Sequence, residues 1–144
     1  MLETIAVGTD GSATATKAVE FALDLAERYS ARVVFISSYH PVSESRLRKE
    51  QKEAPQELQW SLNPAEDVEA TLRDVEELAD QRGLKWTSEA REGDPADVLV
   101  DLAEEHDADV LVIGNKGMQR RVLGSVPNSV SHKANCSVMI VKTT

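Results

Sequence analysis

Short runs of aliphatic residues alternate along the chain with longer segments of helical periodicity. Three of these runs, residues 33–36, 110–113 and 138–141, are continuous apolar stretches rich in valine and isoleucine. Strands covered by helices on both faces have this composition, whereas strands with one wet face alternate apolar and polar residues. The alternation of such strands with helices predicts an α/β domain with a mainly parallel sheet.

The predicted elements extend over most of the chain. We predict five strands, at residues 4–8, 32–38, 85–91, 109–113 and 137–142, with the charged 85–91 strand at an edge of the sheet. Helices are predicted over residues 13–29 and 66–81, where apolar residues recur every three or four positions. Two more are predicted to begin at Asp94-Pro95 and after Gly124-Ser125, and residues 40–63 are predicted to be a long connection.

The chain length limits how these elements are arranged. One hydrophobic core commonly serves about 100 to 200 residues, so the 144 residues are predicted to form a single domain, residues 1–144. Hydrophobic residues make up 41% of the chain and charged residues 28%, a balance typical of globular proteins. A parallel sheet needs helices on both faces, which predicts a three-layer α/β/α sandwich of Rossmann-like topology with a five-stranded parallel sheet.

The charge is uneven along the chain. The net charge of −9 opposes general binding to nucleic acid and to anionic membranes, so we expect neither among the partners. All 25 acidic residues lie at or before Asp109, whereas residues 110–144 contain five basic residues and no acidic one. This acid-free segment is where an anion is accommodated most easily.

Cysteine content and apolar run lengths bear on the compartment. Cys136 is the only cysteine, so no intramolecular disulfide can form, and a reducing, cytoplasmic setting is predicted. No apolar run approaches the roughly 18 to 20 residues of a membrane helix, and the first residues lack the basic and apolar regions of a signal peptide.

Glycine-containing turns follow the first and fourth predicted strands. These two strands are expected to be neighbours where the chain reverses direction across the sheet, which is the usual ligand crevice of such folds. The first leads into residues 9–12 (Thr-Asp-Gly-Ser) and the fourth into residues 114–117 (Gly-Asn-Lys-Gly). Glycines let backbone amides approach a phosphate, and Gly124-Ser125 places further amides at a helix start. Asp10 either caps the first helix, as Ser12 equally can, or binds a ribose or base.

Together these motifs resemble the universal stress protein family, over essentially the whole chain. The resemblance rests on residues 5–12, 37–41 (Ser-Ser-Tyr-His-Pro), 93–96 (Gly-Asp-Pro-Ala) and, most specifically, the run from residue 112 to 141. It implies an adenine nucleotide alpha hydrolase-like fold and a regulatory role under stress. It also implies binding of an adenine nucleotide, with ATP ranked first and Mg²⁺ as its accompanying ion; AMP and cyclic AMP rank after ATP, and some single-domain relatives bind cyclic AMP.

The resemblance further implies which residues surround the nucleotide. Asp10 would meet the ribose or adenine, and Ser38 would meet adenine through its backbone. The implied set is Thr9, Asp10, Ser38, Ile113, Gly114, Asn115, Gly117, Arg120, Arg121, Gly124, Ser125 and Val126. Only six residues, 118–123, separate Gly117 from Gly124, where nine are usual in the family. The shorter segment leaves ATP, AMP, cyclic AMP and no ligand as alternatives, although two arginines in it suit phosphate.

The residue pattern favours a binding protein over an enzyme. The three histidines are scattered, no Gly-x-Ser-x-Gly elbow occurs, and no carboxylate pair flanks the glycine turn. We therefore predict no catalytic residue and no metal site. A slow ATPase and a dimeric interaction module without nucleotide are the alternatives. A phosphoacceptor receiver domain is disfavoured because Asp10 stands alone after the first strand.

The last predicted strand is apolar and would be an exposed sheet edge. An edge of this kind is a template for pairing with another chain, which predicts a homodimer. In the family such strands pair antiparallel across a two-fold axis, and the contact here would be made by Val138, Met139, Ile140 and Val141.

Overall fold

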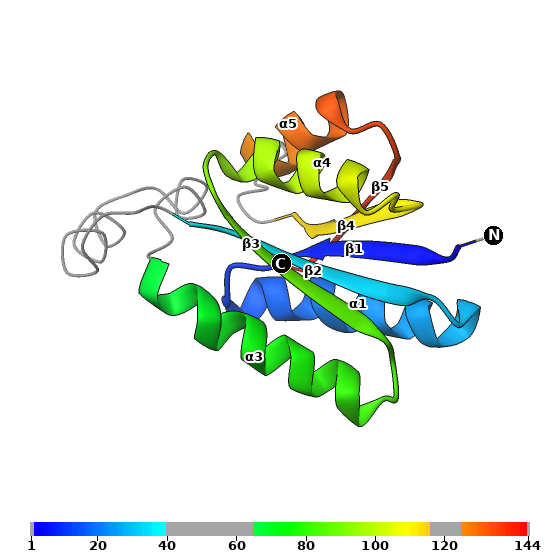
Figure 1. Ribbon diagram of the computed structural model, residues 1–144. Coiled ribbons are helices and arrows are strands. Elements are labelled where there is room, and N and C mark those ends of the chain that lie inside the picture. Colours follow the sequence, from blue (N-terminus) through cyan, green and yellow to red (C-terminus); the bar gives the residue numbers. More distant parts are fainter. Residues whose placement is uncertain (1, 40–64, 116–124, 144) are drawn as a thin grey trace.

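The computed structural model describes residues 2–39, 65–115 and 125–143. In this part of the chain, five strands form one parallel sheet in the order β3-β2-β1-β4-β5 (Figure 1). The strands are β1 (Thr4–Gly8), β2 (Arg32–Tyr39), β3 (Trp86–Glu92), β4 (Val110–Gly114) and β5 (Ser137–Val141). The predicted adjacency of the first and fourth strands is confirmed, and so is the edge position of the strand at 85–91.

Helices cover both faces of the sheet. Helices α1 (Ala13–Tyr29) and α3 (Ala65–Gln81) lie on one face, and α4 (Pro95–Glu105) and α5 (Ser125–Lys133) lie on the other (Figure 1). Right-handed crossovers require this division, because the chain moves one way across the sheet from β1 to β3 and the opposite way from β3 to β5. The predicted α/β/α sandwich is confirmed, with element ends shifted by one residue at most. The long connection predicted at 40–63 lies outside the described residues.

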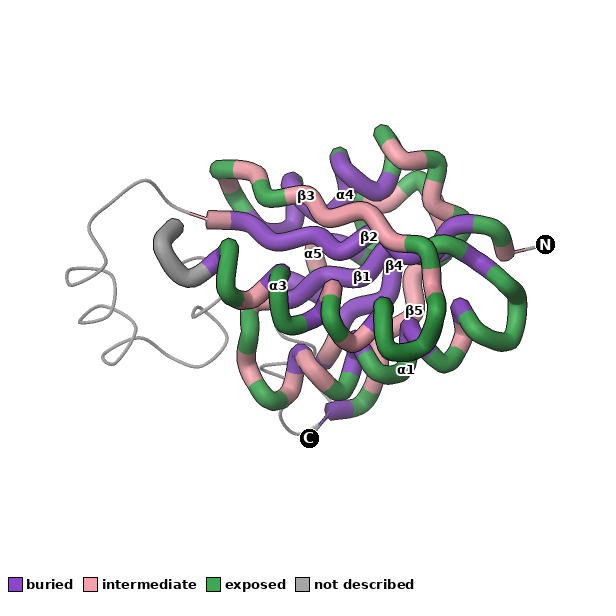
Figure 2. Tube along the Cα trace, turned by 60° about the horizontal axis from the view of Figure 1, so that its bottom comes forward, coloured by how far each residue is buried: buried purple, intermediate pink, exposed green. Residues whose placement is uncertain are grey.

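Two apolar layers lie between the helices and the sheet. Side chains of successive strand residues point to opposite faces, so Ile5 and Val7 pack with α1 and α3, whereas Ala6 packs with α4 and α5. The predicted apolar stripe of α1 is fully buried, and it consists of Ala18, Val19, Ala22, Leu23 and Ala26. Figure 2 shows the three inner strands buried except at the ends of β2 and β4, whereas the edge strands β3 and β5 are only partly covered.

Local signals in the sequence account for the helix ends. Ser12 is the N-cap of α1, because its Oγ accepts a hydrogen bond of 3.1 Å from the Ala15 amide. Asp94 caps α4 in the same way, accepting from the Asp97 amide at 3.2 Å. Gly83 has a φ of +69° just after α3, the left-handed conformation in which helices commonly end. The choice between Asp10 and Ser12 as the first cap is thereby decided in favour of Ser12.

The carboxylate of Asp109 ties the beginning of β4 to the beginning of β1. Its Oδ2 accepts hydrogen bonds from the backbone amides of Thr4, at 3.0 Å, and Glu3, at 2.8 Å. These two bonds hold the pKa of Asp109 below its ordinary value. A carboxyl with a lowered folded-state pKa stabilises the fold while it is ionised, so this contribution is complete above about pH 5 and is lost as the pH falls through the folded-state pKa.

We expect Asp109→Asn to lower the free energy of unfolding at pH 7 and to flatten its decline in acid. Urea denaturation of both proteins at several pH values between 7 and 3 measures this. The gap between the two curves should narrow as the pH falls below the ordinary aspartate pKa of about 4, because the unfolded chain then binds a proton that the folded protein takes up only at its lower pKa. A gap that stayed constant over the whole range would contradict a role for the ionised carboxylate.

Candidate functional site

The strands are parallel, so the carboxyl ends of the inner strands β1, β2 and β4 lie together at the same end of the sheet. The chain direction reverses between β1 and β4, and ligands of open α/β sheets bind in the crevice at such a point. The turn after β1 is joined to β2 by a 3.0 Å hydrogen bond from the Thr9 amide to the Ile36 carbonyl. Ser38, also expected at the site, is buried near the end of β2.

The turn between β1 and α1 is held by its own side chains. Asp10 Oδ1 accepts a hydrogen bond of 2.9 Å from the Ser12 amide, and Thr9 Oγ1 accepts one of 3.3 Å from the Gly11 amide. Gly11 has a φ of +82°, and a Cβ added there would lie 2.6 Å from Thr71 Oγ1 of α3. Only glycine suits this position, because both the backbone conformation and the closeness of α3 disfavour a side chain.

A cavity of about 280 Å³ adjoins this turn. Its polar lining includes Asp10 from the turn, Thr16 from α1, and Thr71 and Asp74 from α3. Pockets for whole drug-sized ligands are commonly about 300 to 1,000 Å³, so this cavity suits part of a ligand. No residue of α3 was predicted from the sequence to be at the site. The one sequence feature that points to α3 is Thr71, a polar residue directly before the buried Leu72.

The end of β4, next to β1 in the sheet, contains Ile113 and Gly114, and Asn115 follows it. Ile113 is buried in the core, and Gly114 is half-buried at the strand end. Asn115 is only 2% exposed, and its Oδ1 accepts hydrogen bonds from the amide and the hydroxyl of Thr143, at 2.8 and 2.9 Å. The side chain expected to contact a ligand is therefore engaged with the segment that follows β5.

The remaining predicted site residues divide into two groups. Ser125 and Val126 are in the first turn of α5, where Ser125 is exposed and Val126 is buried. Gly117, Arg120, Arg121 and Gly124 lie outside the described residues. The described part of the site therefore consists of the β1 turn with its cavity, the end of β2, the end of β4 and the beginning of α5.

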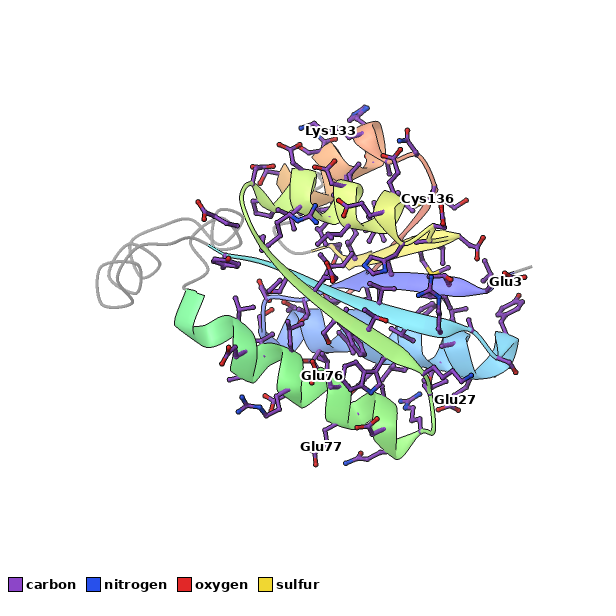
Figure 3. The ribbon with its side chains drawn as sticks, in the orientation of Figure 1. Glu3, Glu27, Glu76, Glu77, Lys133 and Cys136 are labelled. Atoms are coloured by element: carbon purple, nitrogen blue, oxygen red, sulfur yellow. The ribbon has the colours of Figure 1, made fainter. Side chains whose placement is uncertain are left out.

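A larger hollow, of about 1330 Å³, lies at the opposite end of the sheet. Glu3 and Glu27 are on this side of the molecule (Figure 3). Arg82 in this hollow is already paired with Asp24 at 2.6 Å and with Glu27 at 3.2 Å, and the Asp24 hydrogen bond raises the pKa of its guanidinium. The other arginine of this hollow, Arg32, donates to Thr4 Oγ1 and to the His106 carbonyl. Since both arginines bond within the protein and the hollow lies at the amino ends of the strands, we do not assign the site there.

The described residues contain neither a metal-binding cluster nor a membrane-spanning helix. Among them, no three histidine, cysteine, aspartate or glutamate side chains are grouped so that they could hold a metal ion together. None of the helices in residues 2–39, 65–115 and 125–143 has the length and apolar composition needed to cross a bilayer.

Comparison with known proteins shows the family. The model of the universal stress protein family matches residues 1–142. A universal stress protein of Mycobacterium tuberculosis strain H37Rv is 36% identical over 146 residues, covering 99% of this chain and 97% of its own. The crystal structure of a universal stress protein in complex with cAMP is 31% identical, with a TM-score of 0.76 and coverage of 99% and 98%. A universal stress protein from Archaeoglobus fulgidus, solved in complex with dAMP, is 23% identical, covers 99% and 98%, and shares the fold with a TM-score of 0.68. The chain belongs to the universal stress protein family.

Proposed function

We propose that this protein binds an adenine nucleotide at the crevice between the ends of β1 and β4 and acts as a regulatory protein under stress. The observation that carries the proposal is the match, over 99% of the chain and at 31% identity, to a universal stress protein solved with cAMP. The crevice of this chain has the groups that such a ligand needs. Asp10 offers carboxylate oxygens to ribose hydroxyls, and Gly114 allows close approach of the backbone.

The charge distribution supports the same location. Residues 110–144 contain five basic residues and no acidic one, so this segment itself brings no negative charge that would repel a phosphate on the β4 side. The first turn of α5, with Ser125 exposed, adds amides that favour an anion. A single phosphate group is enough to interact with both the basic segment and the amides at the beginning of α5.

Among adenine nucleotides, we rank cyclic AMP ahead of AMP and ATP. The segment between Gly117 and Gly124 is three residues shorter than is usual in the family, a reduction of up to about 10 Å in extended reach. A ligand with a single phosphate loses least from a shorter segment. ATP, with Mg²⁺ as its accompanying ion, remains in the proposal as a weaker ligand.

Titration calorimetry with cyclic AMP, AMP, ATP with Mg²⁺ and cyclic GMP tests the proposal. We expect cyclic AMP to bind most tightly, cyclic GMP to bind least, and Asp10→Asn to weaken cyclic AMP binding by about tenfold, the loss expected for a charge-assisted hydrogen bond. Asp107→Asn is the matched control, since Asp107 is an exposed turn aspartate lining the hollow at the other end of the sheet. If the parent protein bound none of these nucleotides, the alternative function, a dimeric interaction module without nucleotide, would be favoured. Undiminished binding to Asp10→Asn would contradict this crevice.

We also propose a homodimer paired through β5. The two sheet edges differ in the way that decides pairing: β3 contains Glu89, Arg91 and Glu92, whereas Val138–Val141 of β5 has no charge and is half-buried. Charged residues protect an edge from pairing, and an apolar edge invites it. The β5 edge would pair with β5 of a second copy, antiparallel across a two-fold axis.

The neighbouring side of α1 extends this apolar surface. Phe21 and Tyr29 are 43% and 48% exposed, and the half-buried Leu25 lies between them at the four-residue spacing of one helix face. One turn before Phe21, Lys17 Nζ donates to the carbonyl of Thr143, just after β5. The stripe Phe21, Leu25 and Tyr29 therefore runs on the β5 side of α1, where a second copy would cover it.

We further propose that the protein is cytoplasmic and non-enzymatic, with a very slow ATPase as the alternative. The single cysteine, Cys136, supports a reducing compartment, and burial raises the pKa of its thiol, which keeps it in the less reactive form. Release of inorganic phosphate from ATP, followed at saturating nucleotide, decides between a binding protein and a slow hydrolase.

A further inference from the structure

Thr143, two residues after β5, is one of the few buried polar residues in the described part of the chain, at 3% exposure. Its amide and hydroxyl both donate to Asn115 Oδ1, at 2.8 and 2.9 Å, and its carbonyl accepts from Lys17 Nζ at 3.3 Å. The segment after β5 is thereby connected to the end of β4 and to the first turns of α1. We refer to the two bonds between Asn115 and Thr143 as the Asn115–Thr143 clamp.

The clamp closes around Gly114, the glycine at the end of β4. On one side, the Asn115 amide donates to the Val141 carbonyl at 3.0 Å and continues the β4–β5 ladder past Gly114. On the other side, a Cβ added to Gly114 would lie 3.3 Å from Thr143 Cγ2 and 3.8 Å from the Thr14 carbonyl oxygen. The side of Gly114 on which a side chain would stand is therefore closed by the methyl group of Thr143 and, slightly farther away, by the beginning of α1.

Burial makes the clamp energetically significant. Asn115 is only 2% exposed, so its amide oxygen must form its hydrogen bonds within the protein. A buried acceptor left without a hydrogen bond would cost a substantial part of the folding free energy. Gly114 has no side chain with which to hold its own position. Its orientation is consequently set by the residue that follows it, and that residue is held by Thr143.

We propose that Asn115 and Thr143 are positioning residues of the nucleotide site, which hold the Gly114 backbone in the geometry that receives the ligand. This inference rests on the proposed nucleotide binding at the β1–β4 crevice. In this proposal the Asn115 side chain acts on the nucleotide site by positioning Gly114 and does not contact the nucleotide directly. The residues after β5 thereby become part of the binding site.

Two substitutions of Thr143 separate its hydroxyl from its methyl group. Thr143→Val keeps the shape and removes the hydroxyl that donates to Asn115, whereas Thr143→Ser keeps the hydroxyl and removes Cγ2. We expect Thr143→Val to weaken cyclic AMP binding by about fivefold or more, the factor that corresponds to one lost hydrogen bond, and Thr143→Ser to stay within about twofold of the parent. Titration calorimetry well below each melting temperature measures both.

Thr4→Val is the matched control for a purely structural effect. Thr4 is also a buried threonine, and its Oγ1 accepts a 3.0 Å hydrogen bond from Arg32 Nε at the opposite end of the sheet. Thr4→Val should lower thermal stability to a similar extent as Thr143→Val while leaving the affinity for cyclic AMP unchanged. Equal losses of affinity in the two variants would mean that Thr143 acts through general stability, which would overturn the inference.

A double substitution tests the link to Gly114. Gly114→Ala alone should weaken cyclic AMP binding because the new Cβ crowds Thr143 Cγ2. In Gly114→Ala/Thr143→Ser that methyl group is absent, so we expect at least half of the lost binding free energy to return. If serine gave no recovery, the effect of Gly114→Ala would be direct contact with the ligand, against the clamp.

The outcomes distinguish the inference from the proposal on which it rests. If the parent protein bound none of the four nucleotides, the proposed function and the inference would both be wrong. If it bound cyclic AMP and Thr143→Val bound it equally well, only the inference would be wrong. The fivefold loss in Thr143→Val, retention in Thr143→Ser and recovery in the double variant together would establish the clamp as a positioning device.

Discussion

Ile140→Lys is expected to convert the protein from a dimer to a monomer at micromolar concentration. Ile140 is the fourth of the five residues of β5, pairs with Ile113 of β4, and is half-buried within a single chain. In the proposed dimer it would be covered by the same strand of the second copy, so lysine would place two unpaired ammonium groups near a two-fold axis. Burying an unpaired charge in an interface costs about 2 to 5 kcal/mol, which raises the dissociation constant by a factor of about 30 or more.

Sedimentation velocity over a range of concentrations measures this change. Thr87→Lys is the matched control, because Thr87 is a half-buried residue of the other edge strand and pairs with Val34, whose side chain is on the same face as Ile113. The control should remain dimeric, and circular dichroism should show both variants folded. A parent protein that sedimented as a monomer, or a dimer unaffected by Ile140→Lys, would refute pairing through β5.

Leu99→Ala is expected to cause the largest loss of stability among single substitutions near the site, about 2 to 5 kcal/mol. Leu99 of α4 is fully buried, and it packs directly beneath Gly8, the last residue of β1. A Cβ added to Gly8 would lie 2.6 Å from Leu99 Cδ2, so the two positions share one space. Removing the leucine side chain opens a cavity under the strand that leads into Thr9 and Asp10.

This shared space permits a compensation experiment. Gly8→Ala alone should destabilise the protein by overpacking, at a cost of about 1 to 3 kcal/mol. In the background of Leu99→Ala the new methyl group would fill part of the cavity, so the double variant should be more stable than the sum of the two losses predicts. Leu102→Ala is the control, since Leu102 is equally buried in α4 but contributes none of the three atoms nearest to a Cβ at Gly8. Urea denaturation, with the same dependence on urea concentration for every protein, measures the free energy of unfolding of the parent and of each variant. Strict additivity in the Leu99 pair would contradict the packing described.

Much of the fold was predictable because each element has a strong local signal. The continuous apolar runs of β2, β4 and β5 and the buried stripe of α1 identified strands and a helix to within one residue. The handedness of crossovers then limited the sheet to few strand orders and placed the β1 turn beside the β4 turn. The charges of β3 and the apolar character of β5 correctly predicted both sheet edges.

The candidate site was predictable only in part. Asp10 and Gly114 were predicted as site residues because glycine turns after parallel strands meet at one end of the sheet, and Thr9 was predicted from the family resemblance; all three assignments stay predictions. The contribution of Thr71 and Asp74 was not, because their presence beside Asp10 depends on how α3 packs across α1. Nor does a sequence distinguish Asp10 from Ser12 as a helix cap, since the two side chains are equally able to accept a backbone amide.

The sequence by itself determined the elements, their order across the sheet and the end of the sheet at which we propose the site. These follow from periodicity, capping residues and crossover handedness, which act over short stretches or as general rules. Only the tertiary structure decided that Asn115 turns to Thr143, and that Gly11 is confined by Thr71. Asn115 and Thr143 are 28 residues apart in sequence, and a hydrogen bond between such residues exists only once β4 and β5 are paired. Contacts of this kind leave no local pattern, because their partners are chosen by the packing of the whole domain.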